Sequence, residues 1–180
     1  MSHDKEEDMK DLLIVVDMQN DFVSGSLGTK EAKNIVSNVV DVAKNFDGDI
    51  YFTRDTHEED YLETQEGKNL PVKHCIKGTE GWEIIDELKG FVKDNVIDKV
   101  TFGSKELVEK LEQINQTEGI KSVTLVGLCT DICVISNALM LKGFMPEVKI
   151  KVIADACAGV TPESHERALE SMKTCQVSVE

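Results

Sequence analysis

The residues with the clearest chemical potential lie in residues 127–134 (GLCTDICV). The apolar run 122–126 before them predicts a buried strand that ends at a glycine. Thr130 is a candidate helix N-cap, Asp131 would add negative charge to the first turn, and the apolar residues that follow recur at helical spacing. Cys133 is therefore predicted in a helix's first turn, where backbone N–H groups lower a thiol pKa and stabilise an oxyanion. The segment predicts a nucleophile, with a buried structural cysteine as the alternative.

Further reactive side chains fall where other predicted strands end. They are Asp17 after residues 12–16, Asp55 and His57 after residues 50–53, and Lys99 after residues 95–98. Each has an ordinary explanation alone: Asp17 as a cap, Lys99 as a surface cation, Asp55 and His57 as solvated loop residues. Strands of an open parallel sheet, however, present their carboxyl ends at one edge, where ligands bind. Their joint occurrence with Cys133 therefore predicts a single active site.

The elements that must position this site alternate between strand and helix along the chain. Strands are predicted at 12–16, 50–53, 95–98, 122–126, 148–154 and 176–179. Helices are predicted from Ala32 to near Gly48, over Trp82–Leu88, and from 107, 130 and 161 onward, whereas residues 58–81 form a long polar loop. This alternation predicts an α/β fold, a single-domain open parallel β-sheet of about six strands with helices on both faces. Residues 1–10 are expected to be a flexible N-terminus, and 11–180 the folded domain.

Composition limits the functional classes. The chain has 180 residues, 41% of them hydrophobic, and a net charge of −14. That charge argues against nucleic acid or an anionic membrane surface as a partner. The N-terminus is polar and no apolar run reaches membrane-spanning length, so a cytoplasmic location is expected. Five cysteines without disulfide-framework spacing are expected to be thiols.

Five segments together resemble the isochorismatase-like cysteine hydrolases, the superfamily that contains nicotinamidases. They are residues 14–22 (IVVDMQNDF), 53–57 (TRDTH), 74–79 (HCIKGT), Lys99 and 127–134. The resemblance implies a catalytic triad of Asp17, Lys99 and Cys133. It also implies a cis peptide at Leu128–Cys129, which would aim the backbone N–H of Cys129, with that of Cys133, at the substrate oxyanion. Lys99 and the helix terminus are expected to favour the thiolate of Cys133.

A metal site is the second expectation. Residues two apart in an extended strand point to the same side, so Asp55 and His57 can converge on one ion. The resemblance implies His74 as a third ligand and Glu66 as a carboxylate ligand. Such a set suits a divalent metal, Zn²⁺ first, with Fe²⁺ or Mn²⁺ as alternatives. A subgroup that keeps these residues without binding metal is the other interpretation.

The resemblance implies hydrolysis of a small carboxamide to acid and ammonia through a thioester, because isochorismatases proper lack the cysteine. Nicotinamide is the leading substrate, and Phe22, Leu128 and Trp82 are the expected substrate contacts. One departure is Leu70, where nicotinamidases carry an aromatic residue before the proline.

Other functions remain as alternatives to nicotinamide hydrolysis. They are another small-amide or ureido hydrolase, a thiol redox or binding protein using Cys129 and Cys133, and a silent member acting through an oligomeric surface. The resemblance also implies a homo-oligomer.

Overall fold

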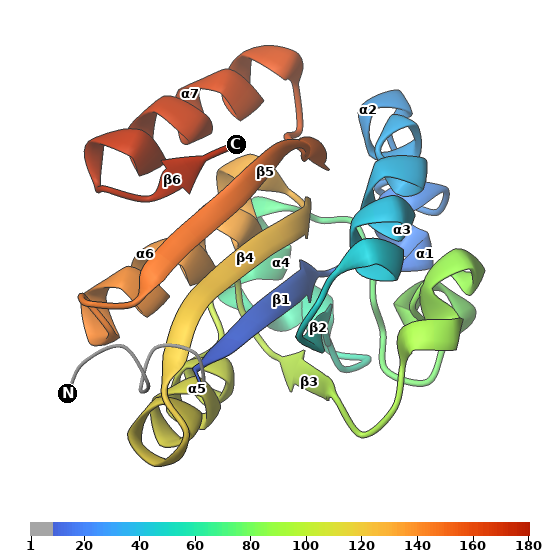
Figure 1. Cartoon of the computed structure of the whole chain (residues 1–180). Coiled ribbons are helices and arrows are strands. Elements are labelled where there is room, and N and C mark those ends of the chain that lie inside the picture. Colours follow the sequence, from blue (N-terminus) through green and yellow to red (C-terminus); the bar gives the residue numbers. More distant parts are fainter. Residues whose placement is uncertain (1–8) are drawn as a thin grey trace, which may run out of the picture.

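The computed structural model describes residues 9–180, which form one sheet covered by helices (Figure 1). The strands are β1 (Lys10–Val16), β2 (Asp49–Asp55), β3 (Val96–Lys99), β4 (Ile120–Leu128), β5 (Lys149–Ala158) and β6 (Ser178–Val179). They make a six-stranded sheet in the order β3-β2-β1-β4-β5-β6, and every neighbouring pair is parallel. The predicted open parallel sheet is therefore confirmed.

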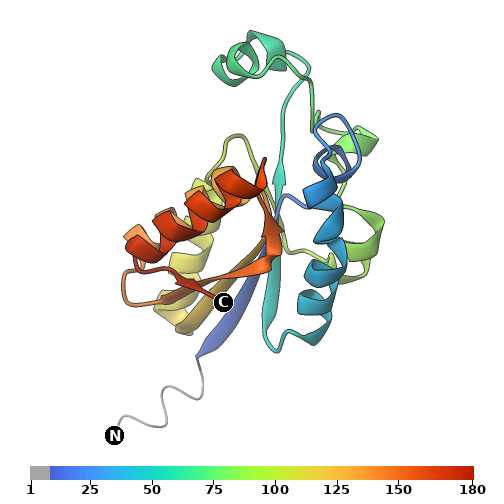
Figure 2. The same ribbon diagram turned by 90° about the horizontal axis from the view of Figure 1, so that it is seen from above.

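Helices cover both faces of the sheet (Figure 2). One face carries α2 (Lys30–Asn34) and α3 (Val36–Asn45), next to the short α1 (Asn20–Val23). The other carries α5 (Lys105–Thr117), α6 (Ile135–Phe144) and α7 (Pro162–Thr174). The segment after β2, with η1 (Tyr61–Glu63) and α4 (Gln65–Asn69), extends away from the sheet in Figure 2. Among residues 9–180, no helix is both long and apolar enough to cross a lipid bilayer.

The central strand β1 explains how one apolar run supports two cores. Leu12, Ile14 and Val16 pack with α5, α6 and α7, whereas Leu13 and Val15 pack with α2 and α3. All five are 0% exposed, because alternate side chains of a strand point to opposite faces and both faces are covered. The carboxyl end of β1 is thereby held rigidly, and the site is built at that end.

Several predicted boundaries differ from the structure. β1 begins at Lys10, inside the range expected to be flexible, and the rest of that prediction, residues 1–8, lies outside the described residues. The single helix predicted from Ala32 is divided into α2 and α3 at Ile35.

The helix predicted over Trp82–Leu88 is also wrong. Two 3₁₀ turns, η2 (Glu80–Trp82) and η3 (Asp86–Phe91), stand there instead. Between them Ile84 forms an antiparallel bridge with Gln19, and the N–H of Ile85 donates to Met18. Backbone groups that would form the hydrogen bonds of a continuous helix are therefore bonded to the segment after β1 instead.

Candidate active site

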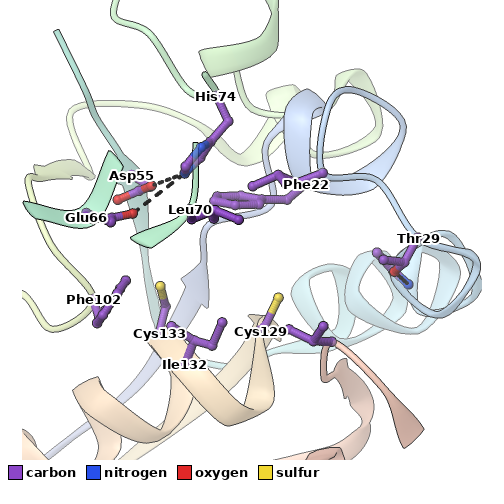
Figure 3. A pocket seen from close by; sticks show the side chains of 13 residues that line it. Phe22, Thr29, Asp55, Glu66, Leu70, His74, Phe102, Cys129, Ile132 and Cys133 are labelled. Carbon is purple, nitrogen blue, oxygen red and sulfur yellow. Dashed lines mark hydrogen bonds and ion pairs between the residues drawn. The ribbon is translucent and has the colours of Figure 1, made fainter. Parts of the chain in front are cut away.

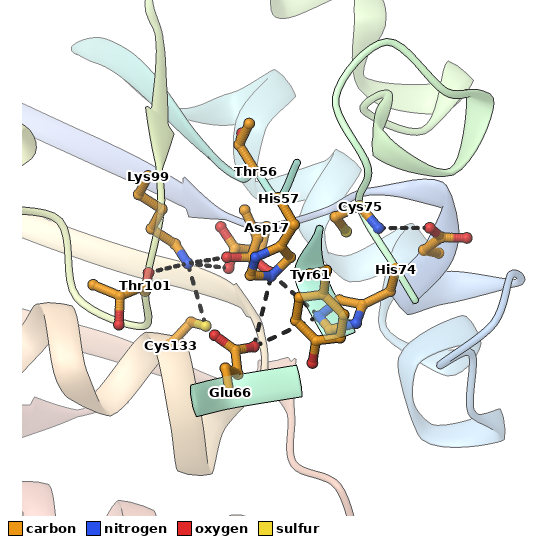
Figure 4. A network of polar contacts seen from close by, with 12 residues as sticks. Asp17, Thr56, His57, Tyr61, Glu66, His74, Cys75, Lys99, Thr101 and Cys133 are labelled. Atoms are coloured by element: carbon orange, nitrogen blue, oxygen red, sulfur yellow. Dashed lines mark hydrogen bonds and ion pairs between the residues drawn. The ribbon is translucent and has the colours of Figure 1, made fainter. Parts of the chain in front are cut away.

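Four of the predicted site residues lie at the carboxyl ends of adjacent strands. Asp17 follows β1, Asp55 ends β2, Lys99 ends β3 and Cys133 lies shortly after β4. The strand order makes these four ends neighbours. All four residues are buried, at 0%, 3%, 3% and 6% exposure respectively. The structure therefore brings them together, as the strand-end pattern predicts (Figure 4).

The turn that carries Cys133 begins where β4 passes close to β1. Gly127 has φ +114°, and a side chain there would collide with the backbone of Val16. The Leu128–Cys129 peptide is cis, as the resemblance implies. Thr130–Val134 then forms a π-helical turn that leads into α6, so Cys133 lies at the start of a helix as predicted. Such turns inside helices occur frequently at functional sites.

Thr130 does not cap this helix, contrary to the prediction. Its hydroxyl makes no capping hydrogen bond and instead lies 2.7 Å from Nδ1 of His165 on α7. The N–H groups of Ile132 and Val134 donate to the carbonyl of Cys129 at 3.1 and 3.0 Å. The turn is thus closed by a backbone carbonyl, which leaves the threonine side chain free to contact another helix.

Lys99 is the centre of the polar network in Figure 4. Its Nζ lies 2.7 Å from Oδ2 of Asp17 and 3.4 Å from Sγ of Cys133, and it donates to the carbonyl of Thr101 at 3.0 Å. Oδ1 of Asp17 accepts a hydrogen bond from the Thr53 hydroxyl at 2.7 Å. Within residues 9–180, Oδ2 is ion-paired with the lysine but has no partner in hydrogen-bond geometry. One oxygen of Asp17 is therefore held in place while the other can accept a proton.

Burial shifts the pKa values of Cys133, Asp17 and Lys99. Burial, reinforced by the charge of Asp17, raises the pKa of Cys133 well above its ordinary value, although Lys99 acts in the opposite direction. Burial also raises the pKa of Asp17 against the effect of Lys99. Burial would lower the pKa of Lys99, but Asp17, Cys133 and Asp55 raise it overall. Lys99 favours the thiolate as expected, whereas burial and the charge of Asp17 favour the thiol.

The predicted metal ligands form a compact cluster beside this network. One ligand atom from each of Asp55, His57, Glu66 and His74 lies within 4.8 Å of the others. Oδ2 of Asp55 is 2.8 Å from Nε2 of His57 and 3.5 Å from Nε2 of His74, and Oε1 of Glu66 is 3.6 and 3.8 Å from the same nitrogens. Nδ1 of His74 donates to the carbonyl of Val72 at 2.7 Å. That hydrogen bond leaves Nε2 as the lone-pair nitrogen turned toward the cluster.

The charges of the cluster favour a cation at its centre. Burial would raise the pKa of Asp55, but the contacts with both histidines and with Lys99 lower it overall, so it is a carboxylate. Burial and the charge of Asp55 raise the pKa of Glu66. Burial would lower the pKa of His74, yet its bonds to Asp55 and to a backbone carbonyl raise it. Two crowded carboxylates and two imidazoles are the donor set of a divalent transition-metal site, so the residues fit the expected ion.

Three residues that support the cluster were not predicted. Gln19 is 0% exposed, and its side-chain amide bonds both the N–H and the carbonyl of Asp55, each at 2.8 Å. Asp21 accepts the N–H of Cys75, the neighbour of His74, at 2.7 Å. The ring of Tyr61 lies 4.6 and 4.9 Å from the two histidine rings. The first two lie within the segment 14–22 that carries the family resemblance, directly after a buried strand, but no role is predicted for them from the sequence.

One cavity joins the thiol and the cluster (Figure 3). Its volume is about 180 Å³, and Cys133 lines one side while Asp55, Glu66 and His74 line the other. Most of the remaining wall is apolar and includes Phe22, Leu27, Leu70, Phe102, Cys129, Ile132 and Val160. The small volume and mostly apolar wall suit a small molecule with a polar group near the sulfur.

Phe22 therefore lies where a substrate contact is expected, but two other predicted contacts do not. Trp82 is outside the cavity, since its indole N–H donates to Thr56 at 2.9 Å and the Arg54 guanidinium lies 3.4 Å from its ring centroid. Leu128 is 1% exposed and packs in the core on the α2–α3 face. Phe102, after β3, lines the cavity and was missed because its loop shows no regular pattern.

Residues 11–180 match the isochorismatase domain, and the chain therefore belongs to the isochorismatase family of hydrolases. A plant relative, nicotinamidase 3 of Arabidopsis thaliana, is 31% identical over 89% of this chain and 79% of its own length. The ureidoacrylate amidohydrolase of Acinetobacter baylyi is 26% identical over 90% of this chain and 76% of its own length.

A solved structure of similar fold adds a metal to the comparison. The pyrazinamidase of Pyrococcus horikoshii, solved in complex with zinc, superposes with a TM-score of 0.79 at 29% identity. The match covers 95% of this chain and 98% of that one.

Proposed function

We propose that this hydrolase cleaves a small aromatic carboxamide to the acid and ammonia through a thioester on Cys133, with nicotinamide as the leading substrate. The observation that carries the proposal is a single cavity lined by a buried thiol and by Asp55, Glu66 and His74, three members of the four-residue metal-type cluster. A substrate amide placed at the sulfur leaves its ring between the apolar walls, with the ring edge toward the cluster. The nicotinamidase and pyrazinamidase relatives support this substrate class.

The first half of the reaction forms the thioester. Sγ of Cys133 attacks the amide carbonyl carbon while its proton passes to the unbonded Oδ2 of Asp17. Lys99 stabilises the negative charge that develops on sulfur, and the N–H groups of Cys129 and Cys133 stabilise the oxyanion. The carbon–nitrogen bond then breaks, and Asp17 returns the proton to the leaving group, which departs as ammonia.

The second half releases the acid. Asp17, again a carboxylate, takes a proton from a water molecule that attacks the thioester carbon. The carbon–sulfur bond breaks, and Cys133 recovers the proton from Asp17. A raised pKa suits Asp17 to this exchange, because a group that accepts and returns one proton works best with a pKa close to the working pH.

Asp55, His57, Glu66 and His74 would hold a divalent ion, which we propose is Zn²⁺. Bound there, the ion would supply an anchor for a ring nitrogen of a heteroaromatic amide. The protein side chains do the rest of the positioning, with Phe22 against one part of the ring and the apolar walls excluding water.

A second candidate is a ureido-acid hydrolase that uses the same nucleophile. Leu70 favours it, because this aliphatic residue lines the cavity where an aromatic residue would stack on a pyridine ring. The ureidoacrylate amidohydrolase relative belongs to that reaction class.

Ammonia release by the zinc-loaded protein on nicotinamide, pyrazinamide, benzamide and a ureido acid tests the proposal. Activity on the first two, weaker activity on benzamide, which lacks the ring nitrogen, and none with Cys133→Ala are expected. Silence on both heteroaromatic amides would overturn the substrate, and activity on the ureido acid alone would establish the second candidate.

A further inference from the structure

We propose that His165 is a positioning residue that holds the cysteine turn in its reactive geometry through the hydroxyl of Thr130. The proposal rests on the proposed role of Cys133 as nucleophile. His165 lies outside the cavity, so its effect would pass through the turn and not through substrate contact.

The contact is made inside the protein. Thr130 is 0% exposed, and its hydroxyl lies 2.7 Å from Nδ1 of His165. Because this threonine does not cap its own helix, the histidine is the hydrogen-bond partner of that hydroxyl within residues 9–180. Losing the partner would leave a buried hydroxyl unsatisfied, which a rearrangement of the turn would relieve.

A second tie joins the same two segments. The N–H of Val160 points to both carboxylate oxygens of Asp131, at 3.2 and 3.4 Å. Two consecutive residues of the cysteine turn are therefore held by the same neighbouring segment: Thr130 by His165 at the start of α7, and Asp131 by Val160 in the connection between β5 and α7. Gly159 lets this connection fold closely against the start of α7, since a Cβ there would lie 2.8 Å from the backbone nitrogen of His165.

His165 is itself well placed to act as a fixed support. It lies in the first turn of α7, where Thr161 and Ser164 form a reciprocal capping box with hydrogen bonds of 3.0 and 3.1 Å. Buried Leu169 and Met172 anchor the rest of the helix in the core. A rigid helix thus supports the π-helical turn that carries Cys133. Because small shifts of a nucleophile reduce its reactivity strongly, this support should affect the rate of reaction.

The experiment compares His165→Ala, His165→Asn, Thr130→Val and the Ala/Val double variant. Asparagine places an amide near the position of Nδ1, and valine keeps the shape of threonine without its hydroxyl. Two readouts are used: kcat and KM for amide hydrolysis, and the rate at which iodoacetamide alkylates Cys133. The exposed Cys175 in the same molecule serves as the internal reference for alkylation.

We expect His165→Ala and Thr130→Val each to lower kcat and Cys133 alkylation about three- to tenfold, the worth of one hydrogen bond, with KM unchanged. The double variant should show no further loss, and His165→Asn should recover most of the rate. Ser171→Ala is the matched control, because it removes a hydrogen bond from the exposed Ser171 hydroxyl to the carbonyl of Arg167 on the same helix without touching the start of α7 or Thr130. It should leave both rates unchanged.

Wild-type rates in both single variants, multiplicative losses in the double variant, no recovery with asparagine, or an equal loss in the Ser171 control would each overturn the proposal. Thr130→Val preserves the packing, so it decides the question if His165→Ala does not fold. If the wild-type protein hydrolyses no amide, the proposed function fails, and the alkylation rates still decide whether His165 positions Cys133.

Discussion

Replacing Lys99 with methionine removes one charge from the centre of the site while keeping most of the side-chain volume. The lysine side chain is 1% exposed, and its Nζ lies 2.7 Å from Asp17 and 3.4 Å from both Asp55 and Cys133. Water therefore cannot replace the ammonium group. The substitution tests directly whether this cation supports both the base and the nucleophile.

The distances set the size of the effect. With an effective dielectric constant of about 20, unit charges interact by about 6 kcal/mol at the 2.7 Å separation and about 5 kcal/mol at 3.4 Å. Leaving Asp17 and Asp55 buried without their partner should destabilise the fold by about 3–5 kcal/mol, part of which protonation of Asp17 relieves. A protonated Asp17 cannot accept the thiol proton, and the sulfur loses its stabilising charge. We expect kcat/KM to fall about 10²- to 10³-fold, as for loss of one charge-stabilising donor.

The assay is ammonia release across pH, together with the alkylation rate of Cys133 and a thermal melt that verifies folding. In Lys99→Met the acidic limb of kcat/KM should move to higher pH, because the pKa of Asp17 rises further without the ammonium. Lys105→Met is the matched control, since that side chain is 86% exposed on α5 and should leave activity unchanged. A folded Lys99→Met enzyme with nearly full activity and an unmoved acidic limb would refute the role assigned to Lys99.

Three further predictions concern the same site. Cys133→Ala should abolish ammonia release, whereas Cys129→Ala keeps the backbone N–H and should retain most of it; equal loss in both would contradict a backbone role for Cys129. Asp17 must be ionised to act and burial raises its pKa, so kcat/KM should rise with pH through a pKa above the ordinary carboxyl range. An acidic limb of the pH profile at the ordinary aspartate pKa would contradict this. Elemental analysis should find no bound zinc in His74→Ala and a lower zinc content in Glu66→Gln, while Cys133 alkylation is retained in both variants. Full zinc content in His74→Ala would exclude His74 as a ligand.

The fold could be predicted because its strongest signals are local. The run LLIVV is apolar at every position, as expected of a strand covered on both faces, and β1 is that strand. Alternation with helical patterns then implied the parallel sheet, and the sheet placed strand-end residues at one edge. Asp17, Lys99 and Cys133 are brought together for this reason, although they are far apart in the chain.

The parts that failed depend on contacts between distant segments. The local sequence predicts Thr130 as a helix N-cap, but its hydroxyl contacts His165 on another helix, and no local pattern reveals that contact. Trp82 is held outside the cavity by Arg54 on β2 and by Thr56 directly after that strand. The effect of burial on the pKa of Cys133 could not be predicted, because the charge of Lys99 is visible in the sequence and the degree of burial is not.

The central claim is that Cys133 carries the acyl group of the substrate. Turnover of nicotinamide in the presence of hydroxylamine tests it directly, because the amine intercepts a thioester whichever step limits the rate. We predict that nicotinohydroxamate forms with the wild-type protein and not with Cys133→Ala, and that any acyl group trapped by acid quenching lies on Cys133. Hydrolysis of nicotinamide with no hydroxamate and no acylated Cys133, or with the acyl group on Cys129, would contradict the account.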